Sequence, residues 1–232
     1  MIGVYDYTVV LTYLSLLSAG TGIMVALGES GHPFLGIFFL LFCGLCDAFD
    51  GKVASTKKDR TDMGRKFGIQ IDSLSDLVAF GVLPVCIGGA FIRVSESTID
   101  FITGEWYNWV AKVAVYGVLA LYILAALIRL AYFNVTEEER QSTETGARKY
   151  YLGLPVTSAS VIFPAVGLLQ YLMRPICDLT WLYILTVIVV GVLFVTPFKL
   201  KKLKLKGILV LVGVGVIEFV ALAIAYIVRE VI

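Results

Sequence analysis

Apolar stretches long enough to cross a membrane recur along the whole chain, and this feature limits its possible folds most. A helix needs roughly 20 predominantly apolar residues to cross about 30 Å of hydrocarbon. With 59% apolar and 16% charged residues, the chain is also far more hydrophobic than a soluble domain. We therefore expect an all-α, polytopic membrane helical bundle. Apolar length and the Gly, Pro and charge breaks predict about seven transmembrane helices, near residues 7–27, 33–50, 68–92, 106–133, 153–173, 180–198 and 207–228.

Basic residues gather in alternate connections between the expected spans. The connections after the second, fourth and sixth spans are rich in lysine and arginine, whereas the others contain almost none. This bias predicts a cell-membrane protein with its N-terminus inside and its C-terminus outside. The spans leave no stretch for a soluble domain, so we expect residues 1–232 to form a single transmembrane domain. A net charge of +1 without a continuous basic surface gives no reason to expect a nucleic-acid partner.

Four aspartates stand on the two sides of the connection between the second and third spans. Asp47 and Asp50 are three residues apart, and Asp72 and Asp76 are four apart, so each pair shares a helix face. A carboxylate at membrane depth costs at least about 2.5 kcal/mol on insertion scales, so something is expected to neutralise them. Hard oxygen ligands without cysteine or histidine favour one or two divalent ions, Mg²⁺ or Mn²⁺, with Ca²⁺ as a further candidate.

Two other interpretations of the aspartates stay open at this point. Solvated carboxylates at helix ends are expected at scattered positions, not as two pairs flanking one basic connection. A cation-coupled membrane transporter also carries acids in its helices, but near the middle of the membrane. The aspartates are expected instead at the cytoplasmic helix ends beside lysines and arginines, which suits an anionic nucleotide ligand.

The aspartate region resembles the signature of the CDP-alcohol phosphatidyltransferase family. The run DAFDGKVA at residues 47–54, followed by Gly68, Asp72 and Asp76, matches D-x-x-D-G-x-x-A-R, a spacer and G-x-x-x-D-x-x-x-D. The chain departs from the signature at Ser55, where the family has arginine, and in a longer spacer. The candidates to replace that arginine at a phosphate are Lys52, Lys57 and Lys58.

Further segments look like the phosphatidylserine synthase branch of this family. Residues 72–84, DSLSDLVAFGVLP, are similar to its D-S-L-x-D-x-x-x-F-G-x-x-P stretch. Residues 129–134, RLAYFN, resemble its R-L-A-R-F-N, and residues 153–155 match its G-L-P. The last span is not covered by the resemblance. We therefore take residues 44–84 as the catalytic motif region and residues 207–228 as an additional C-terminal span.

The resemblance implies the CDP-alcohol phosphotransferase fold and a reaction within the lipid bilayer. A phosphatidyl group would pass from CDP-diacylglycerol to the hydroxyl of L-serine, giving phosphatidylserine and CMP at the cytoplasmic face. It also implies a homodimer. The nearest alternative keeps this chemistry but uses another acceptor, such as glycerol phosphate or inositol phosphate, which would require a further basic cluster near the metal.

The family's pattern also implies roles for individual residues. The four aspartates would hold the metal, and Asp76 is the candidate general base for the serine hydroxyl. The CDP-diacylglycerol site is expected to consist of Asp47, Asp50, Gly51, Lys52, Ala54, Gly68 and Asp72. The candidates for binding serine or phosphate are Arg129, Ser73 and Asn134. For these three, a snorkelling arginine and ordinary helix capping or packing are the alternatives.

Overall fold

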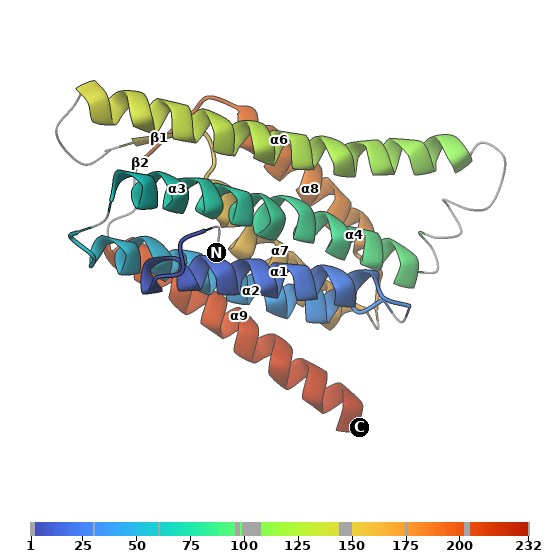
Figure 1. Cartoon of the computed structure of the whole chain (residues 1–232). Coiled ribbons are helices and arrows are strands. Elements are labelled where there is room, and N and C mark those ends of the chain that lie inside the picture. Colours follow the sequence, from blue (N-terminus) through green and yellow to red (C-terminus); the bar gives the residue numbers. More distant parts are fainter. Residues whose placement is uncertain are drawn as a thin grey trace.

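The computed structural model describes residues 3–29, 31–59, 61–95, 98, 108–143, 150–174, 176–201 and 205–231. Its elements, in chain order, are η1 (Tyr7–Val9), α1 (Val10–Leu27), α2 (Pro33–Ser55), α3 (Asp62–Asp76), η2 (Leu77–Val82), α4 (Leu83–Val94), α6 (Asn108–Thr143), β1 (Tyr150–Leu152), η3 (Val156–Ser158), α7 (Ala159–Met173), α8 (Thr180–Val195), β2 (Lys199–Lys201) and α9 (Leu205–Val231). Figure 1 shows a helical bundle with α6 along one edge and α9 along the opposite edge.

Five of the described helices are long and apolar enough to cross a membrane. They are Tyr7–Leu27, Pro33–Ser55, Asp62–Val94, Trp109–Arg140 and Val156–Met173. Two shorter apolar helices, Thr180–Val195 and Val210–Ala225, follow them. The polytopic helical membrane bundle expected from the sequence is confirmed, with the two shorter helices at the places of the sixth and seventh spans.

The third span begins earlier than predicted, at Asp62 instead of residue 68. The Thr61 side chain caps this helix by accepting a hydrogen bond from the Gly64 backbone N–H at 3.1 Å. Because the first turns of α3 are polar, an apolar pattern could not place this start. Arg65 and Lys66, expected in a connection, consequently lie on α3.

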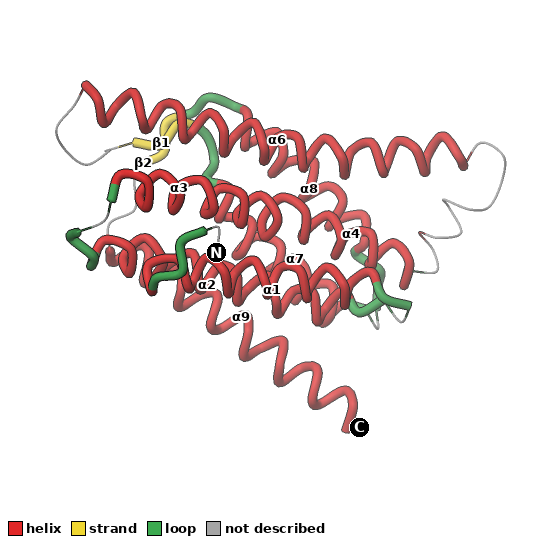
Figure 2. Tube along the Cα trace, in the orientation of Figure 1, coloured by secondary structure: helices red, strands yellow, loops and turns green. Residues whose placement is uncertain are grey.

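A short antiparallel ribbon was not predicted. β1 pairs with β2, with Tyr150 opposite Lys201 and Leu152 opposite Lys199. Figure 2 shows the ribbon at the end of the bundle where α2 finishes and α3 begins.

Gly153 follows this ribbon with a φ of +75°, and its backbone N–H donates to the Phe198 oxygen at 2.7 Å. A Cβ at Gly153 would meet the Thr196 oxygen at 3.1 Å, so the turn requires glycine. The fifth span therefore starts at Val156 and the sixth ends at Val195, where residues 153 and 198 were predicted. Trp106 and Tyr107, at the predicted start of the fourth span, lie outside the described residues.

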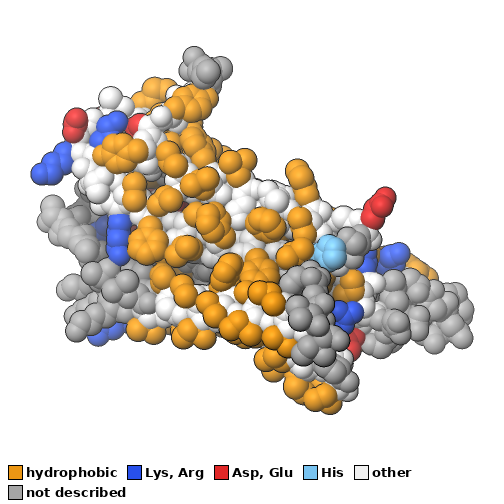
Figure 3. Space-filling model, turned by 90° about the horizontal axis from the view of Figure 1, so that it is seen from below, with side chains coloured by type: hydrophobic (Ala, Val, Ile, Leu, Met, Phe, Trp, Pro, Cys, Tyr) orange, Lys and Arg blue, Asp and Glu red, His pale blue; other side chains and the backbone are white. Residues whose placement is uncertain are grey.

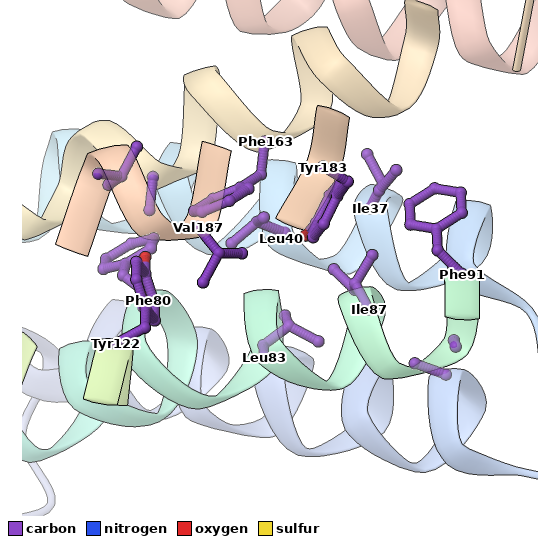
Figure 4. Close-up of a cluster of buried hydrophobic side chains, with 14 of the residues drawn as sticks. Ile37, Leu40, Phe80, Leu83, Ile87, Phe91, Tyr122, Phe163, Tyr183 and Val187 are labelled. Atoms are coloured by element: carbon purple, nitrogen blue, oxygen red, sulfur yellow. The ribbon is translucent and has the colours of Figure 1, made fainter. Parts of the chain in front are cut away.

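The core lies between α2, α4, α6, α7 and α8. Figure 4 shows Tyr122, Phe163 and Tyr183 from three of these helices pointing toward one another. The Tyr122 and Phe163 rings meet edge to face at 5.7 Å, and the Phe163 and Tyr183 rings are 5.2 Å apart. Such aromatic pairs stabilise packing beyond the area that they bury. They give the bundle a rigid centre behind the site described below.

A π-helical segment, η2, interrupts the long helix immediately after Asp76. Pro84 supplies the physical reason, because proline has no N–H to donate and its ring clashes with the carbonyl four residues earlier, that of Phe80. The Phe80 oxygen accepts instead from the Tyr122 hydroxyl at 2.8 Å. The Tyr183 hydroxyl donates to the Pro84 oxygen at 3.0 Å. Buried tyrosines thus satisfy the backbone that the proline disturbs.

The outer surface is apolar where lipid is expected. Figure 3 shows hydrophobic side chains over the middle of one face, with Lys and Arg side chains toward its two ends. Exposed leucines, valines and isoleucines occur on α1, α6, α8 and α9. This distribution fits a bundle whose middle lies in hydrocarbon and whose ends lie in water.

The last helix, α9, packs on α2 and α7, and in Figure 1 its C-terminal end lies away from the other helices. The Phe219 ring meets the Phe38 ring at 5.0 Å, and the Tyr171 hydroxyl donates to the Ala225 oxygen at 3.1 Å. Glu218 is buried in this contact, and its Oε2 atom has no hydrogen-bond partner within the described part of the chain.

Candidate active site

Two helices bring the aspartates together at one end of the bundle, here called the aspartate end. Asp47 and Asp50 lie on α2, and Asp72 and Asp76 lie on α3. One carboxylate oxygen from each of Asp47, Asp50 and Asp72 lies within 4.8 Å of the other two. The spacings of three and four residues give each helix one carboxylate-bearing face. The structure therefore converges three of the four predicted ligands.

Asp76 is not part of this group of three oxygens. It lies one helical turn beyond Asp72, and its residue is 9% exposed. The π-helical segment starts at the next residue, Leu77. Inserted π turns change the direction in which the following side chains point and are frequent at functional sites. Asp76 is thus a buried carboxylate beside the group, at the point where the helix changes its winding.

The group of three carboxylates fits a divalent cation. An ion with oxygen ligands at about 2.0 to 2.6 Å can bridge oxygens that are about 4 to 5 Å apart. The ion pairs among the described side chains are Lys57 with Asp6 and Arg140 with Glu137. Neither pair supplies a cationic side chain to these aspartates. Clustered, partly buried carboxylates without a cationic side chain require another positive charge. All-oxygen ligands favour Mg²⁺, Mn²⁺ or Ca²⁺ over zinc.

Two of the residues expected to border a nucleotide, Gly51 and Lys52, are exposed. A Cβ at Gly51 would meet no atom within 4 Å, and Lys52 is exposed with its Nζ atom 5.6 Å from the Phe49 ring centroid. Ala54 and Gly68 are partly buried on α2 and α3. The α2 end of the site is therefore accessible to a ligand.

Ser55 stands where the family signature has arginine, so this position provides no positive charge. The Ser55 hydroxyl donates to the Lys52 backbone oxygen at 2.7 Å, within its own helix. Lys57 is paired with Asp6 at 2.9 Å. The pKa of Asp6 is lowered to about 2 by the hydrogen bond from the Thr8 hydroxyl and by that from Lys57. Of the three candidate lysines, Lys57 thus has another partner, while Lys52 is exposed beside the site.

Two of the candidates for binding serine or phosphate contact each other. Asn134 Nδ2, on α6, donates to the Ser73 hydroxyl, on α3, at 2.7 Å. This bond places α6 against the helix that carries Asp72 and Asp76. A packing role and a substrate role are both compatible with the contact.

Arg129 also lies on α6, and it contacts the turn that follows β1. Its residue is 5% exposed, its Nε donates to the Leu154 oxygen at 3.0 Å, and its guanidinium lies 5.7 Å from the Phe133 ring centroid. Arg129 thus ties α6 to the Gly153-Leu154-Pro155 turn. The structure shows a buried arginine with a structural bond, in place of the snorkelling arginine considered above.

Sequence reasoning missed the contribution of α1. The Thr12 hydroxyl lies 3.5 Å from Asp50 Oδ2, and the Ser75 hydroxyl donates to the Thr12 backbone oxygen at 3.2 Å. The available signal was the recurrence of hydroxyl residues at helical spacing, at Thr8 on η1 and at Thr12, Ser15 and Ser18 on α1. Hydroxyls are common in membrane helices, so this pattern alone did not point to a site.

Comparison with protein-family models finds one family that matches most of the chain. The model of the family described as CDP-alcohol phosphatidyltransferase matches residues 8–196 and so contains all four aspartates, while α9 lies beyond it. No solved structure matches the chain.

Curated relatives match over shorter stretches. A CDP-diacylglycerol–serine O-phosphatidyltransferase of Saccharomyces cerevisiae is 35% identical over 120 residues, 51% of this chain and 36% of the relative. A Helicobacter pylori protein of the same name is 30% identical over 142 residues, 61% of this chain and 49% of the relative. An archaetidylserine synthase of Methanothermobacter thermautotrophicus is 32% identical over 149 residues, 64% of this chain and 53% of the relative.

The chain thus spans about half or less of the length of these relatives. The family model, in contrast, covers most of the chain and both aspartate-bearing helices. With the aspartate spacing, the converging carboxylates and this match in agreement, the chain belongs to the CDP-alcohol phosphatidyltransferase family.

Proposed function

We propose that this chain is a phosphatidylserine synthase, which transfers a phosphatidyl group from CDP-diacylglycerol to L-serine and releases CMP. The observation that carries the proposal is the convergence of Asp47, Asp50 and Asp72 inside the segment matched by the family model. The acceptor is inferred from the relatives, whose names specify serine transfer or archaetidylserine synthesis. It is also inferred from the DSLSDLVAFGVLP segment at residues 72–84.

Asp47, Asp50 and Asp72 would hold Mg²⁺ or Mn²⁺, one or two ions, through carboxylate oxygens. The metal would bind the pyrophosphate of CDP-diacylglycerol, polarise the phosphorus under attack and neutralise charge on the departing CMP. Gly51, Lys52, Ala54 and Gly68 would border the CDP moiety. The open space beside Gly51 and the exposed Lys52 ammonium favour an anionic ligand at this end of α2.

Asp76 would act as general base for the acceptor alcohol. Its carboxylate takes the proton of the serine hydroxyl as the serine oxygen forms a bond to the phosphorus of the phosphatidyl group. The bond from that phosphorus to the bridging oxygen then breaks, and CMP leaves with its oxygen. Asp76 suits this role because it is buried, adjoins the carboxylate group and is not one of the three converging oxygens.

The acceptor site would lie between α3 and α6. Ser73, next to Asp72, and Asn134 meet there and offer a hydroxyl and an amide to the amino acid. Arg129 would act on this region through the turn at Leu154, which it holds. An acceptor that carries its own phosphate would require additional cations near the aspartates; Lys52, on the same helix as Asp47 and Asp50, is an exposed candidate.

We further propose that residues 1–232 form one transmembrane domain in the cell membrane, working as a homodimer with the aspartate end at the cytoplasmic face. The positive bias of the connections at that end supports the orientation. Under this orientation α9 is an additional span that lies beyond the family match.

CMP release from purified protein in detergent tests the proposal. The protein is incubated with CDP-diacylglycerol, Mn²⁺ or Mg²⁺, and one acceptor at a time: L-serine, glycerol 3-phosphate or inositol phosphate. We expect CMP release with serine alone, and its loss in EDTA. Release only with a phosphorylated alcohol would overturn the acceptor. No release with any of these alcohols would overturn the transferase and favour the remaining alternative, a cation-coupled transporter.

A further inference from the structure

Thr12, on the first helix, makes polar contacts at the aspartate end. Its side chain is buried, at 5% exposure, although threonine is polar. The Thr12 hydroxyl contacts Asp50 Oδ2 at 3.5 Å, on α2. Its backbone oxygen accepts from the Ser75 hydroxyl at 3.2 Å, on α3, and Ser75 is the neighbour of Asp76. One residue of α1 therefore contacts both aspartate-bearing helices.

We propose that Thr12 is a positioning residue of the carboxylate centre, which sets the separation between the α2 and α3 aspartates and orients Asp50. This inference rests on the proposed function, because it assumes that the carboxylates bind a divalent ion. The Thr12 hydroxyl is a donor, so it fixes one oxygen of a charged carboxylate and leaves the other for a ligand.

The geometry gives Thr12 a role beyond packing α1 against α2. Two further polar contacts join these helices in the turns below: the Cys43 thiol to the Ser15 backbone oxygen at 3.3 Å, and the Ser18 hydroxyl to the Phe39 oxygen at 3.0 Å. These contacts remain when the Thr12 hydroxyl is removed. Figure 1 shows α1 lying along α2 over its whole length. Loss of the hydroxyl is therefore expected to alter the carboxylate centre without detaching the helix.

Contact with Ser75 supplies the second half of the proposal. Asp76 follows Ser75 directly, and the π-helical segment begins at Leu77. A hydrogen bond from Ser75 to α1 fixes the helix just before its winding changes. The Thr12 backbone oxygen consequently holds α3 at Ser75, next to Asp76 and just before the π-helical segment.

Mn²⁺ binding to the purified, metal-free protein tests the proposal, measured by the loss of the free-Mn²⁺ electron paramagnetic resonance signal. Thr12→Val keeps the branched shape and removes the donor. We expect the Mn²⁺ dissociation constant to rise about tenfold, the lower end of the effect of outer-shell partners. Thr12→Ser should restore binding, which a purely steric role for the threonine would not do. Ser75→Ala should weaken Mn²⁺ binding in the same direction.

Two matched controls lie on the same helix. Thr21 is exposed and donates to its own helix, at the Leu17 oxygen, so Thr21→Val should leave Mn²⁺ binding unchanged. Ser18→Ala removes a contact between α1 and α2 far from the aspartates and should lower the melting temperature alone. If wild-type protein binds Mn²⁺ and Thr12→Val binds it equally well, the inference about Thr12 is wrong. If Asp72→Asn leaves Mn²⁺ binding unchanged, the metal site itself is overturned.

Discussion

The two ends of the bundle hold their carboxylates in opposite ways. At the aspartate end, three carboxylates converge within 4.8 Å, and the Thr12 hydroxyl contacts Asp50 at 3.5 Å. At the opposite end, where α4 and α7 finish and α8 begins, Asp178 is surrounded by hydrogen-bond donors. It accepts bonds from the Ser95 hydroxyl, from Gln170 Nε2 at 2.8 Å, and from the Thr180 backbone N–H and hydroxyl at 2.9 and 2.6 Å.

The two ends differ in the hydrogen-bond donors that surround their carboxylates. Burial tends to raise the pKa of the Asp178 carboxyl, but the bonds from Ser95, Thr180 and Gln170 outweigh it and hold this pKa well below its usual range. Asp178 is therefore a satisfied charge that ties three helices together. In the described part of the chain, the grouped aspartates crowd their negative charges together without a cationic side chain, so we expect them to bind a cation. We therefore expect the crowded carboxylate group to form the reactive end, and the fully hydrogen-bonded Asp178 to have a structural role.

Charge removal at each end should give the largest contrast. We expect Asp72→Asn to lower metal-dependent CMP release with serine by about 100- to 1,000-fold, as for other preorganised electrostatic groups. Asp178→Asn should leave the rate near that of the wild type, because its site faces no proposed substrate. Initial rates of CMP release at saturating serine measure both. An equal loss of CMP release rate in the two variants would contradict the proposed difference between the two ends.

Asp76 should behave differently from both. We expect Asp76→Asn to lower kcat by about 100- to 10,000-fold, the range for general acid–base catalysis. Mn²⁺ binding should persist in this variant, because the three converging oxygens remain. Rate and Mn²⁺ affinity are measured on the same preparation. Near-normal turnover in Asp76→Asn would reject its role as the base.

Metal should stabilise the aspartate end alone. Mn²⁺ at about 100 times its dissociation constant adds roughly 2.7 kcal/mol to the free energy of unfolding when only the folded state binds it. We expect a corresponding rise in the melting temperature of the wild type and of Asp178→Asn, and none in Asp72→Asn. Differential scanning fluorimetry in detergent with and without Mn²⁺ gives the three shifts. A rise of equal size in Asp72→Asn would place the bound ion elsewhere.

Loss of the Asp178 acceptor should lower the free energy of unfolding moderately. Ser95, Gln170 and Thr180 are all buried, so Asp178→Ala leaves their donors unpaired, at about 1 to 3 kcal/mol of unfolding free energy. The depressed pKa makes this contribution pH-dependent. It is complete above the unfolded-state pKa of about 3.9 and is lost as the pH falls below it, toward the folded-state value. Melting temperatures of wild type and Asp178→Ala should therefore converge at low pH; a constant gap would contradict this.

The sequence predicted the arrangement of the aspartate end in more detail than it predicted the rest of the fold. The spacings of Asp47 with Asp50 and of Asp72 with Asp76 are local, so helical periodicity alone aligns each pair. Their convergence across two helices followed from a short basic connection, and the structure confirms it for three of them. Apolar length located five helices long enough to cross a membrane and two shorter apolar helices among the described residues, because lipid imposes a minimum length on a span.

Contacts between distant segments could not be predicted in this way. Ser95 and Asp178 are 83 residues apart, and no periodicity relates them. β1 and β2 are three residues each, too short for an alternating pattern, and their register depends on the Gly153 turn. In the sequence, Thr12 is one of several hydroxyl residues in an apolar helix. Its contact with Asp50 depends on how α1 packs, which composition does not encode.

Direct Mn²⁺ titration of metal-free protein is the most decisive measurement, with wild type, Asp72→Asn and Asp178→Asn compared by electron paramagnetic resonance. We predict that wild type and Asp178→Asn bind Mn²⁺ with the same affinity, and that Asp72→Asn loses this binding. Binding that survives in Asp72→Asn, or that disappears in Asp178→Asn, would contradict the assignment of the metal centre to the converging aspartates.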